Sequence, residues 1–307
     1  MHSRRGVVLG ALLLLVTLLL GACQSDDGGG GAEETPSKGD VTVGVSGSFA
    51  ENQIVAEMYA QVLENAGYNV DRQLNLQRRE ISQPALETGE IDLKPEYLGT
   101  LLAYLDPNAS PSSDPEGNVE PLNALLEPKG LTMLDYSPAN DTNAFVVTKE
   151  TADKHELTKM SDLAPVASQL RMAGPPECEA RPFCIPGLRD TYGITFGTVE
   201  KIGACDSATA NALDAGKVDV ALLCSTQSII ASKGWVVLED DRKLQKADNI
   251  APVIRNDVLN DEIEELLNGV SAKITTENIT ALNAKVELEQ DDPGAVAREF
   301  LEEQELI

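Results

Sequence analysis

The sequence predicts an α/β protein of two similar halves, each with its own sheet and helices, joined by two crossings of the chain. Apolar runs of strand length alternate with runs of helical periodicity, a pattern typical of sheets rich in parallel strands. One pattern, A-L-x-x-G-x-(I/V)-D, also occurs twice, at residues 85–92 and 212–219. Each copy indicates a helix end, a terminating glycine and a short strand. The repeat suggests equivalent halves that bring corresponding loops to a common cleft.

The first half opens with a strand, a polar turn and a helix. Residues 41–45 form an apolar strand, and a helix with one apolar face is expected over 51–66 before Gly67 ends it. Such a turn can present backbone N–H groups and hydroxyls, including that of Ser48, to a ligand, or it can be an ordinary connection with a serine cap. The other elements expected here are strands at 70–76 and 131–134, a short strand after Gly89, and helices at 81–88, 97–105 and 119–126.

The chain is expected to cross to a second half near residues 139–143 and to return near 239–249, where its polar character rises. Lobe one then comprises residues 40–142 plus 250–307, and lobe two comprises 143–249. Lobe two should contain strands at 144–148, 169–173, 218–223 and 235–238, and helices at 151–155, 160–163, 188–192, 207–215 and 225–233, the last capped by Ser225. The return should continue into a strand at 251–255 and helices at 257–267, 276–287 and 293–304.

The N-terminus has the order of a bacterial lipoprotein signal. Arg4 and Arg5 precede an apolar run over residues 7–20, which is short for a membrane span. The following Leu-Gly-Ala-Cys resembles the bacterial lipobox, which implies that residues 1–22 are removed and that Cys23 is lipidated. A simple signal with an incidental cysteine is the alternative. Residues 23–39 are expected to form a flexible tether, which holds the body at the outer face of the cell membrane.

The charge and the cysteines limit the possible partners. A formal charge of −26 over 307 residues repels nucleic acid and anionic lipid headgroups, so we expect no nucleic-acid partner. Four cysteines follow Cys23, and disulfides persist in exported proteins. Three pairings are possible, of which the short loops favour Cys178–Cys184 with Cys205–Cys224. Metal binding is the weaker interpretation, since His155 is the one histidine of the mature chain and no C-x-x-C pair exists. We therefore expect no metal and no cofactor.

Several segments, in order and with matching spacing, resemble the substrate-binding proteins of glycine betaine/choline (osmoprotectant) ABC importers. Residues 93–100, Leu-Lys-Pro-Glu-Tyr-Leu-Gly-Thr, are similar to that family's Tyr-Pro-Glu-Tyr-Thr-Gly-Thr segment. The others are 49–53 (Phe-Ala-Glu-Asn-Gln), 141–144 (Asp-Thr-Asn-Ala), Arg181 with 186–193, and 240–255. The resemblance covers about residues 41–305. It implies a two-lobed periplasmic-binding-protein fold, type II-like, with two interdomain crossings. It also implies a monomer that closes on a small solute and docks on ABC permease subunits.

The resemblance also assigns roles to individual residues. In this family a quaternary ammonium lies in a cage of tyrosines, held by attraction to the ring faces, and a carboxylate meets arginine, threonine and backbone N–H groups. Carried over by position, Tyr97 is a cage ring, Thr100 a hydroxyl donor and Arg181 the family's arginine. Asp141 matches a position that contributes its backbone carbonyl.

Three cage positions depart from the family pattern, because Asn143, Cys224 and Asp248 stand where tyrosines are usual. Either carboxylates such as Asp248 and Glu51 replace the rings, or the ligand is a more polar or larger solute without a quaternary ammonium. The remaining candidate ligand-binding residues are Ser48, Gln53, Ser225 and Thr226.

Two other classes of function are weaker. An exported hydrolase needs a nucleophile with a positioned base, whereas His155 lies in a charged helical stretch and no G-x-S-x-G is present. A surface interaction protein that reuses the fold would have a filled cleft. We therefore expect a solute receptor and not an enzyme.

Overall fold

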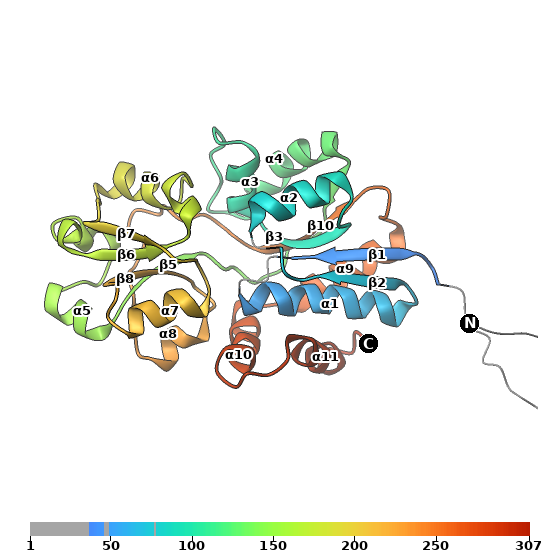
Figure 1. Ribbon diagram of the computed structural model, residues 1–307. Coiled ribbons are helices and arrows are strands. Elements are labelled where there is room, and N and C mark those ends of the chain that lie inside the picture. The colour runs from blue at the N-terminus through green and yellow to red at the C-terminus, as the bar shows by residue number, and fades with distance from the viewer. Residues whose placement is uncertain (1–36, 46–48, 77) are drawn as a thin grey trace, which may run out of the picture. The chain divides into compact units, whose positions relative to one another are not determined.

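The computed structural model describes residues 37–45, 49–76 and 78–307. Within these residues the chain forms two five-stranded sheets, each carrying its own helices (Figure 1). The expected signal segment, residues 1–22, lies outside the described residues, as do Cys23, Ser48 and all but the end of the expected tether.

The first sheet has the strand order β2-β1-β3-β10-β4. Its strands are β1 (Asp40–Gly44), β2 (Asn69–Gln73), β3 (Leu93–Tyr97), β4 (Leu131–Met133) and β10 (Ile250–Arg255). The helices of this half are α1 (Ala50–Ala66), α2 (Arg79–Thr88), α3 (Leu98–Leu105), α4 (Glu116–Leu126), α9 (Asp261–Lys273), α10 (Thr276–Glu287) and α11 (Pro293–Glu303). A short 3₁₀ turn, Glu127–Lys129, follows α4.

The second sheet has the order β7-β6-β8-β5-β9. Its strands are β5 (Asn143–Val147), β6 (Arg171–Gly174), β7 (Thr198–Lys201), β8 (Val220–Cys224) and β9 (Val236–Val237). Its helices are α5 (Lys149–His155), α6 (Ile185–Gly187), α7 (Ser207–Asp214) and α8 (Ser228–Ser232), with a π-turn at Leu188–Tyr192 and 3₁₀ turns at Met160–Leu163, Ala167–Gln169 and Pro176–Glu179.

In both sheets four strands run in the same direction, and the strand that follows each crossing, β10 or β5, runs against its neighbours. The pairs β1–β2, β1–β3, β6–β7 and β6–β8 are parallel. By contrast, β10 is antiparallel to β3 and β4, and β5 is antiparallel to β8 and β9. A chain that enters a sheet from the other half starts at the carboxyl ends of the parallel strands and must run away from them. The expectation of parallel-rich sheets therefore holds for four strands of each sheet and not for the strand after each crossing.

The repeated sequence pattern has the same structural role in both halves. Asp92 Oδ2 accepts a hydrogen bond of 2.8 Å from the Thr42 N–H of β1, and Asp219 Oδ2 accepts one of 2.8 Å from the Arg171 N–H of β6. The preceding glycines, Gly89 and Gly216, have φ angles of 79° and 65°, in the left-handed region that glycine adopts at little cost. The aspartate of the pattern therefore fixes the start of β3 against β1 and the start of β8 against β6. In each sheet this end lies away from the crossings.

Helix α1 is buried on nearly all sides of its middle turns. Ile54, Met58, Tyr59 and Leu63 are fully buried. One side of α1 faces β1 and β2, and the C-terminal helices α10 and α11 cover the other (Figure 1). Because α1 is fixed in this way, the position of its N-terminus, where Glu51 lies, is well defined.

The structure differs locally from several expectations. Helix α9 begins at Asp261 and not at 257, because the Asn260 side chain accepts the Ile263 N–H as its N-cap. Helix α8 begins at Ser228, and Ser225, expected as its cap, instead donates its hydroxyl to Asp141. Strand β7 was missed because its side chains are mostly exposed and polar, so it lacks an apolar pattern.

A glycine of α3 fixes the return crossing at close range. Gly99 N–H donates to the Ala247 carbonyl at 3.0 Å, and a Cβ at Gly99 would lie 2.8 Å from that oxygen. The return crossing therefore packs directly against α3.

We expect Gly99→Ala to lower the free energy of unfolding by roughly 1–3 kcal/mol, since the backbone of the crossing must shift. Gly269→Ala is the matched control. Its Cβ would meet nothing closer than 3.8 Å in the middle of α9, and it should stabilise by roughly 0.5–1 kcal/mol. Urea unfolding measures both; an unchanged Gly99→Ala protein would contradict the close approach.

Candidate functional site

A cavity of about 690 Å³ is lined by residues of both halves. This volume lies within the range of small-molecule sites. The walls come from the carboxyl ends of β3 and β8, the two crossings, the start of α2 and the loop between β6 and α6. Of the residues predicted from the sequence, the cavity is lined by Tyr97, Thr100, Asp141, Asn143, Arg181, Cys224 and Asp248.

The other predicted residues that the structure describes do not line the cavity. Glu51, Ser225 and Thr226 lie directly behind the wall, in hydrogen-bond contact with Tyr97 and Asp141. Gln53 is half-buried one turn into α1 and is not part of the lining. Ser48 lies outside the described residues, so its predicted role stays a prediction.

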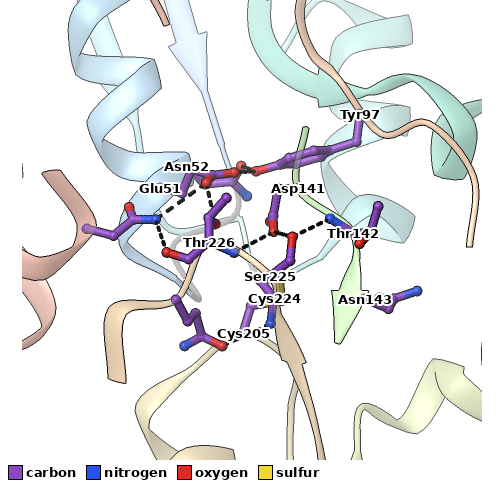
Figure 2. Close-up of a disulfide and its surroundings, with 12 residues drawn as sticks. Glu51, Asn52, Tyr97, Asp141, Thr142, Asn143, Cys205, Cys224, Ser225 and Thr226 are labelled. Carbon is purple, nitrogen blue, oxygen red and sulfur yellow. Dashed lines mark hydrogen bonds between the residues drawn. A yellow bond between two sulfur atoms is a disulfide. The ribbon is translucent and has the colours of Figure 1, made fainter. Parts of the chain in front are cut away.

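Two buried carboxyl groups, those of Glu51 and Asp141, lie where the two halves meet (Figure 2). Glu51 Oε2 accepts a hydrogen bond of 2.6 Å from Thr226 Oγ1 of the second half, and Tyr97 Oη lies 2.8 Å from Glu51 Oε1. Asp141 Oδ1 accepts from Ser225 Oγ at 3.0 Å and from the Thr226 N–H at 3.1 Å. The turn after β8 is therefore held by one carboxyl group from α1 and one from the first crossing.

Burial raises the pKa of both central carboxyl groups. Hydrogen bonds from Thr226 and Tyr97 only partly offset the effect at Glu51, and the charge of Glu51 adds to it at Asp141. Burial and the Glu51 charge also raise the pKa of Tyr97 well above 10, so this side chain is a neutral phenol and a hydrogen-bond donor. A cation beside these groups would favour their ionised forms.

A third carboxyl group, Asp248, lies at the return crossing. Its Oδ1 accepts from the Thr100 N–H at 2.9 Å and lies 3.3 Å from Thr100 Oγ1. Burial raises the pKa of Asp248 to about 7, even though the Thr100 N–H and the charge of Arg79 act in the opposite direction. Asp248 is thus close to its titration point near neutral pH.

The sequence reasoning missed a buried ion cluster beside the cavity. Lys94 is 1% exposed and donates to Glu96 at 2.6 Å, and Arg79 contacts the same carboxylate at 2.7 Å. Burial would raise the pKa of Glu96, but the charges of Arg79 and Lys94 bring it down to about 2. Arg79 also donates to Thr100 Oγ1 at 2.9 Å, so the cluster orients a cavity residue. Charged residues two apart in the short strand before Tyr97 were the available signal.

The aromatic lining is richer than the cage positions suggested. Besides Tyr97, the cavity wall contains the rings of Phe49, Tyr104 and Phe183. The ring centroids of Phe49 and Tyr97 are 6.3 Å apart and the planes are tilted by 33°. None of these additional rings occupies one of the cage positions carried over from the family, and only Phe49 lies in a segment that resembles the family.

Both expected disulfides are present in the structure. Cys178–Cys184 closes the loop that carries Arg181, and Cys205–Cys224 joins the loop before α7 to the end of β8. All four cysteines line the cavity. The disulfide at Cys224 thus occupies the wall where the family pattern has a tyrosine.

Two ion pairs connect the start of α2 with the loop that Cys178–Cys184 closes. Arg181 contacts Glu80 at 3.0 Å, and Arg78 contacts Glu177 at 2.5 Å. All four side chains line the cavity. Arg181 therefore lines the cavity, but it is already engaged by a carboxylate of the other half.

Neither a metal site nor a membrane span is found in the part of the chain that the structure describes. Over these residues, no three His, Cys, Asp or Glu side chains are grouped so as to hold a metal ion. None of the helices described has the length and apolar composition needed to span a bilayer.

Two α/β halves linked by two crossings around a shared cavity define a solute-binding protein of the two-lobed periplasmic type. The chain belongs to the family described as the substrate binding domain of the ABC-type glycine betaine transport system, whose model matches residues 39–303. The fold class and the family expected from the sequence are thereby confirmed.

Individual relatives agree with this family. The chain is 28% identical to a glycine-betaine-binding protein of Pseudomonas aeruginosa over 279 residues, 87% of this chain and 89% of that one. It is 26% identical to the glycine betaine-binding protein YehZ of Escherichia coli over 265 residues, 82% and 87% of the two chains. A crystal structure described as a glycine betaine/carnitine/choline ABC transporter has a TM-score of 0.67 and 29% identity, with 87% and 99% of the chains covered.

The raised pKa of Asp248 predicts a pH-dependent effect of Asp248→Asn. The pKa rises from 3.8 in the unfolded chain to about 7 in the fold, so folding takes up a proton between these pH values. Asp248 therefore stabilises the fold at low pH, and this contribution disappears as the pH rises through 7. An asparagine carries no charge to bury, so the variant should gain roughly 1–4 kcal/mol relative to wild type between pH 5 and pH 8. Urea unfolding at both pH values checks this; equal differences at pH 5 and pH 8 would contradict it.

Proposed function

We propose that this chain is the extracytoplasmic receptor that captures a small quaternary ammonium solute of the glycine betaine or choline kind and delivers it to the permease subunits of an ABC importer. The observation that carries the proposal is a cavity lined by both carboxyl groups and aromatic rings. Asp141 and Asp248 line it together with Phe49 and Tyr97. A quaternary ammonium has no hydrogen to donate, so ring faces and negative charge are what attract it.

Tyr97 is the ring that we place against the ammonium group. Its hydroxyl is anchored, since Oη lies 2.8 Å from Glu51 Oε1 and 3.0 Å from Asn52 Oδ1. A phenol hydroxyl has one proton, so it donates its hydrogen bond to either the Glu51 carboxyl oxygen or the Asn52 amide oxygen at any one time. The ring is thereby held in place beside Phe49, which reduces the entropy lost when a ligand packs against it.

The names of relatives support the ligand class. Two are described as glycine betaine-binding proteins, and another, 27% identical over 276 residues, as the carnitine transport binding protein OpuCC of Listeria monocytogenes. The more polar or larger solute that the lost cage positions suggested is not favoured, because four rings line the cavity.

Catalysis is not part of this proposal. The buried pair Glu51 and Asp141 receives its hydrogen bonds from Thr226, Tyr97 and Ser225, which hold the turn after β8 in place. His155, the one histidine outside the expected signal segment, is the last residue of α5 and does not line the cavity. A receptor that releases its ligand unchanged needs neither a nucleophile nor a base.

The ligand proposal predicts the effect of Tyr97→Ala. Purified protein should bind glycine betaine, choline or carnitine in a calorimetric titration, and Tyr97→Ala should weaken that binding by roughly 3- to 30-fold, the value of one cation–π contact. Tyr97→Phe keeps the ring and should retain most of the affinity. Tyr136→Ala is the control, since Tyr136 does not line the cavity. Absence of heat and of any thermal shift with all three ligands would refute the proposed function.

The location of the receptor is the second part of the proposal. We infer that residues 1–22 are a signal peptide, that lipid on Cys23 anchors the chain, and that residues 23–39 tether a monomeric body near the permease. Residues 1–38 precede the family match, which begins at residue 39.

Cys23→Ser tests the anchor. In a bacterium that processes lipoproteins, the wild-type chain should fractionate with membranes and incorporate labelled palmitate, whereas Cys23→Ser should do neither, because the lipid provides the apolar surface that enters the bilayer. Sedimentation of the unanchored variant then reports the mass of the body, expected to be one chain. A variant that stays in the membrane fraction would contradict the anchor.

A further inference from the structure

The basic side chains that line the cavity are all engaged by glutamates. Among the described residues of the lining, these are Arg78, Arg79, Lys94 and Arg181. Arg79 and Lys94 share Glu96, at 2.7 and 2.6 Å, and are held inside the wall by its charge. The internal positions outside the described ranges, 46–48 and 77, carry Ser, Gly, Ser and Gln, none of which is charged.

The acidic side chains of the lining are not matched in the same way. Asp141, Asp206 and Asp248 line the cavity, and within the described residues no Lys or Arg forms an ion pair with any of them. Asp206 is the N-cap of α7 and accepts the Thr209 N–H at 2.8 Å. The buried Glu51 forms a hydrogen bond of 2.8 Å with the Tyr97 hydroxyl. Acidic side chains of the described lining therefore outnumber the basic ones, and the cavity carries a net negative charge when all of them are ionised.

The resemblance to the family assigns one basic group, Arg181, to a ligand carboxylate. In this structure the Arg181 guanidinium is already paired with Glu80. The Arg181 guanidinium reaches both carboxylate oxygens of Glu80, at 3.0 and 3.1 Å. The two side chains are 38% and 33% exposed, so solvent only partly screens the pair. A ligand carboxylate would have to displace Glu80 and leave that charge unpaired at the wall.

We propose that the cavity selects a quaternary ammonium cation without a carboxylate, such as an ammonium alcohol, over the zwitterionic betaines, and that Glu80 sets this preference by occupying Arg181. The inference rests on the proposed function, because it specifies the ligand class of the same cavity. A monocation compensates the unmatched aspartates and disturbs no ion pair. A betaine brings a further negative charge to a wall whose cationic groups are all taken.

Choline and glycine betaine form a matched pair of ligands for the test. Both carry a trimethylammonium group and are nearly the same size, and they differ in having a hydroxymethyl or a carboxylate group. The dissociation constants of the wild-type protein for both, from calorimetric titration at pH 7.5 and low salt, should differ by about tenfold or more in favour of choline.

Glu80→Gln tests the residue that we hold responsible. The variant frees Arg181, so the ratio of the two dissociation constants should shift by about tenfold toward glycine betaine, the typical value of one charge-assisted hydrogen bond to the ligand carboxylate. Adding Arg181→Met to Glu80→Gln should reverse the shift. Glu177→Gln is the matched control: it removes the same charge from the other ion pair between the halves, which engages Arg78, and should shift the ratio less.

The outcomes separate this inference from the proposed function. If wild-type protein binds glycine betaine as tightly as choline or more tightly, the inference is overturned while the proposed function stands. If it binds neither ligand nor carnitine, the proposed function fails. If Glu80→Gln unfolds, as its melting curve would report, the wild-type ratio alone decides. An unshifted ratio in a folded Glu80→Gln protein removes Glu80 as the determinant.

Discussion

The pairing of each crossing with the carboxyl end of a central strand is the constraint on which the site depends. Tyr97, at the end of β3, is paired with Ile250 of β10, and Cys224, at the end of β8, is paired with Asn143 of β5. The two crossings also bond to each other, since the Asp141 N–H donates to the Asp248 carbonyl at 3.1 Å. Residues far apart in the sequence are thereby fixed around one cavity by backbone hydrogen bonds, independently of any ligand.

Within that frame, the buried charges are the most demanding part of the structure. A buried charge without a partner costs several kcal/mol, so each must be neutralised or hydrogen-bonded where it lies. Glu96 is neutralised by Arg79 and Lys94, and Glu51 receives hydrogen bonds from both halves. Asp141 and Asp248 receive hydrogen bonds but, among the described residues, no cation in an ion pair, and their pKa values are raised accordingly. A cation bound in the cavity would favour the ionised forms of these two carboxyl groups and compensate their charge.

The sequence predicted the architecture well because its signals are local. Alternating strands and helices, helix-ending glycines and a repeated pattern are all readable over eight to twenty residues, and the repeat proved to have the same role in both halves. The strand directions after the crossings depend on tertiary topology and were not readable. The site was predicted by position: Tyr97, Thr100, Asp141, Asn143, Arg181, Cys224 and Asp248 do line the cavity. Phe49, Tyr104, Phe183 and the Lys94 cluster were missed because their contacts join segments that no local pattern relates.

Contacts between the halves affect how much a ligand can contribute to their association. Glu51 with Thr226, Arg181 with Glu80, Arg78 with Glu177, and Glu287 with the Ser228 hydroxyl at 2.7 Å all join residues of the two sheets' helices and loops. A ligand favours one arrangement of a protein only by contacts that it makes better there than elsewhere. Since these polar contacts form within the chain itself, a ligand that leaves them intact adds its own attraction to theirs. A ligand that breaks one of these contacts must compensate for the lost free energy of that contact before it gains any net affinity. The same argument makes the partly exposed ion pairs at the cavity wall, rather than the rings, the part of the site that discriminates between ligands of similar size and different charge.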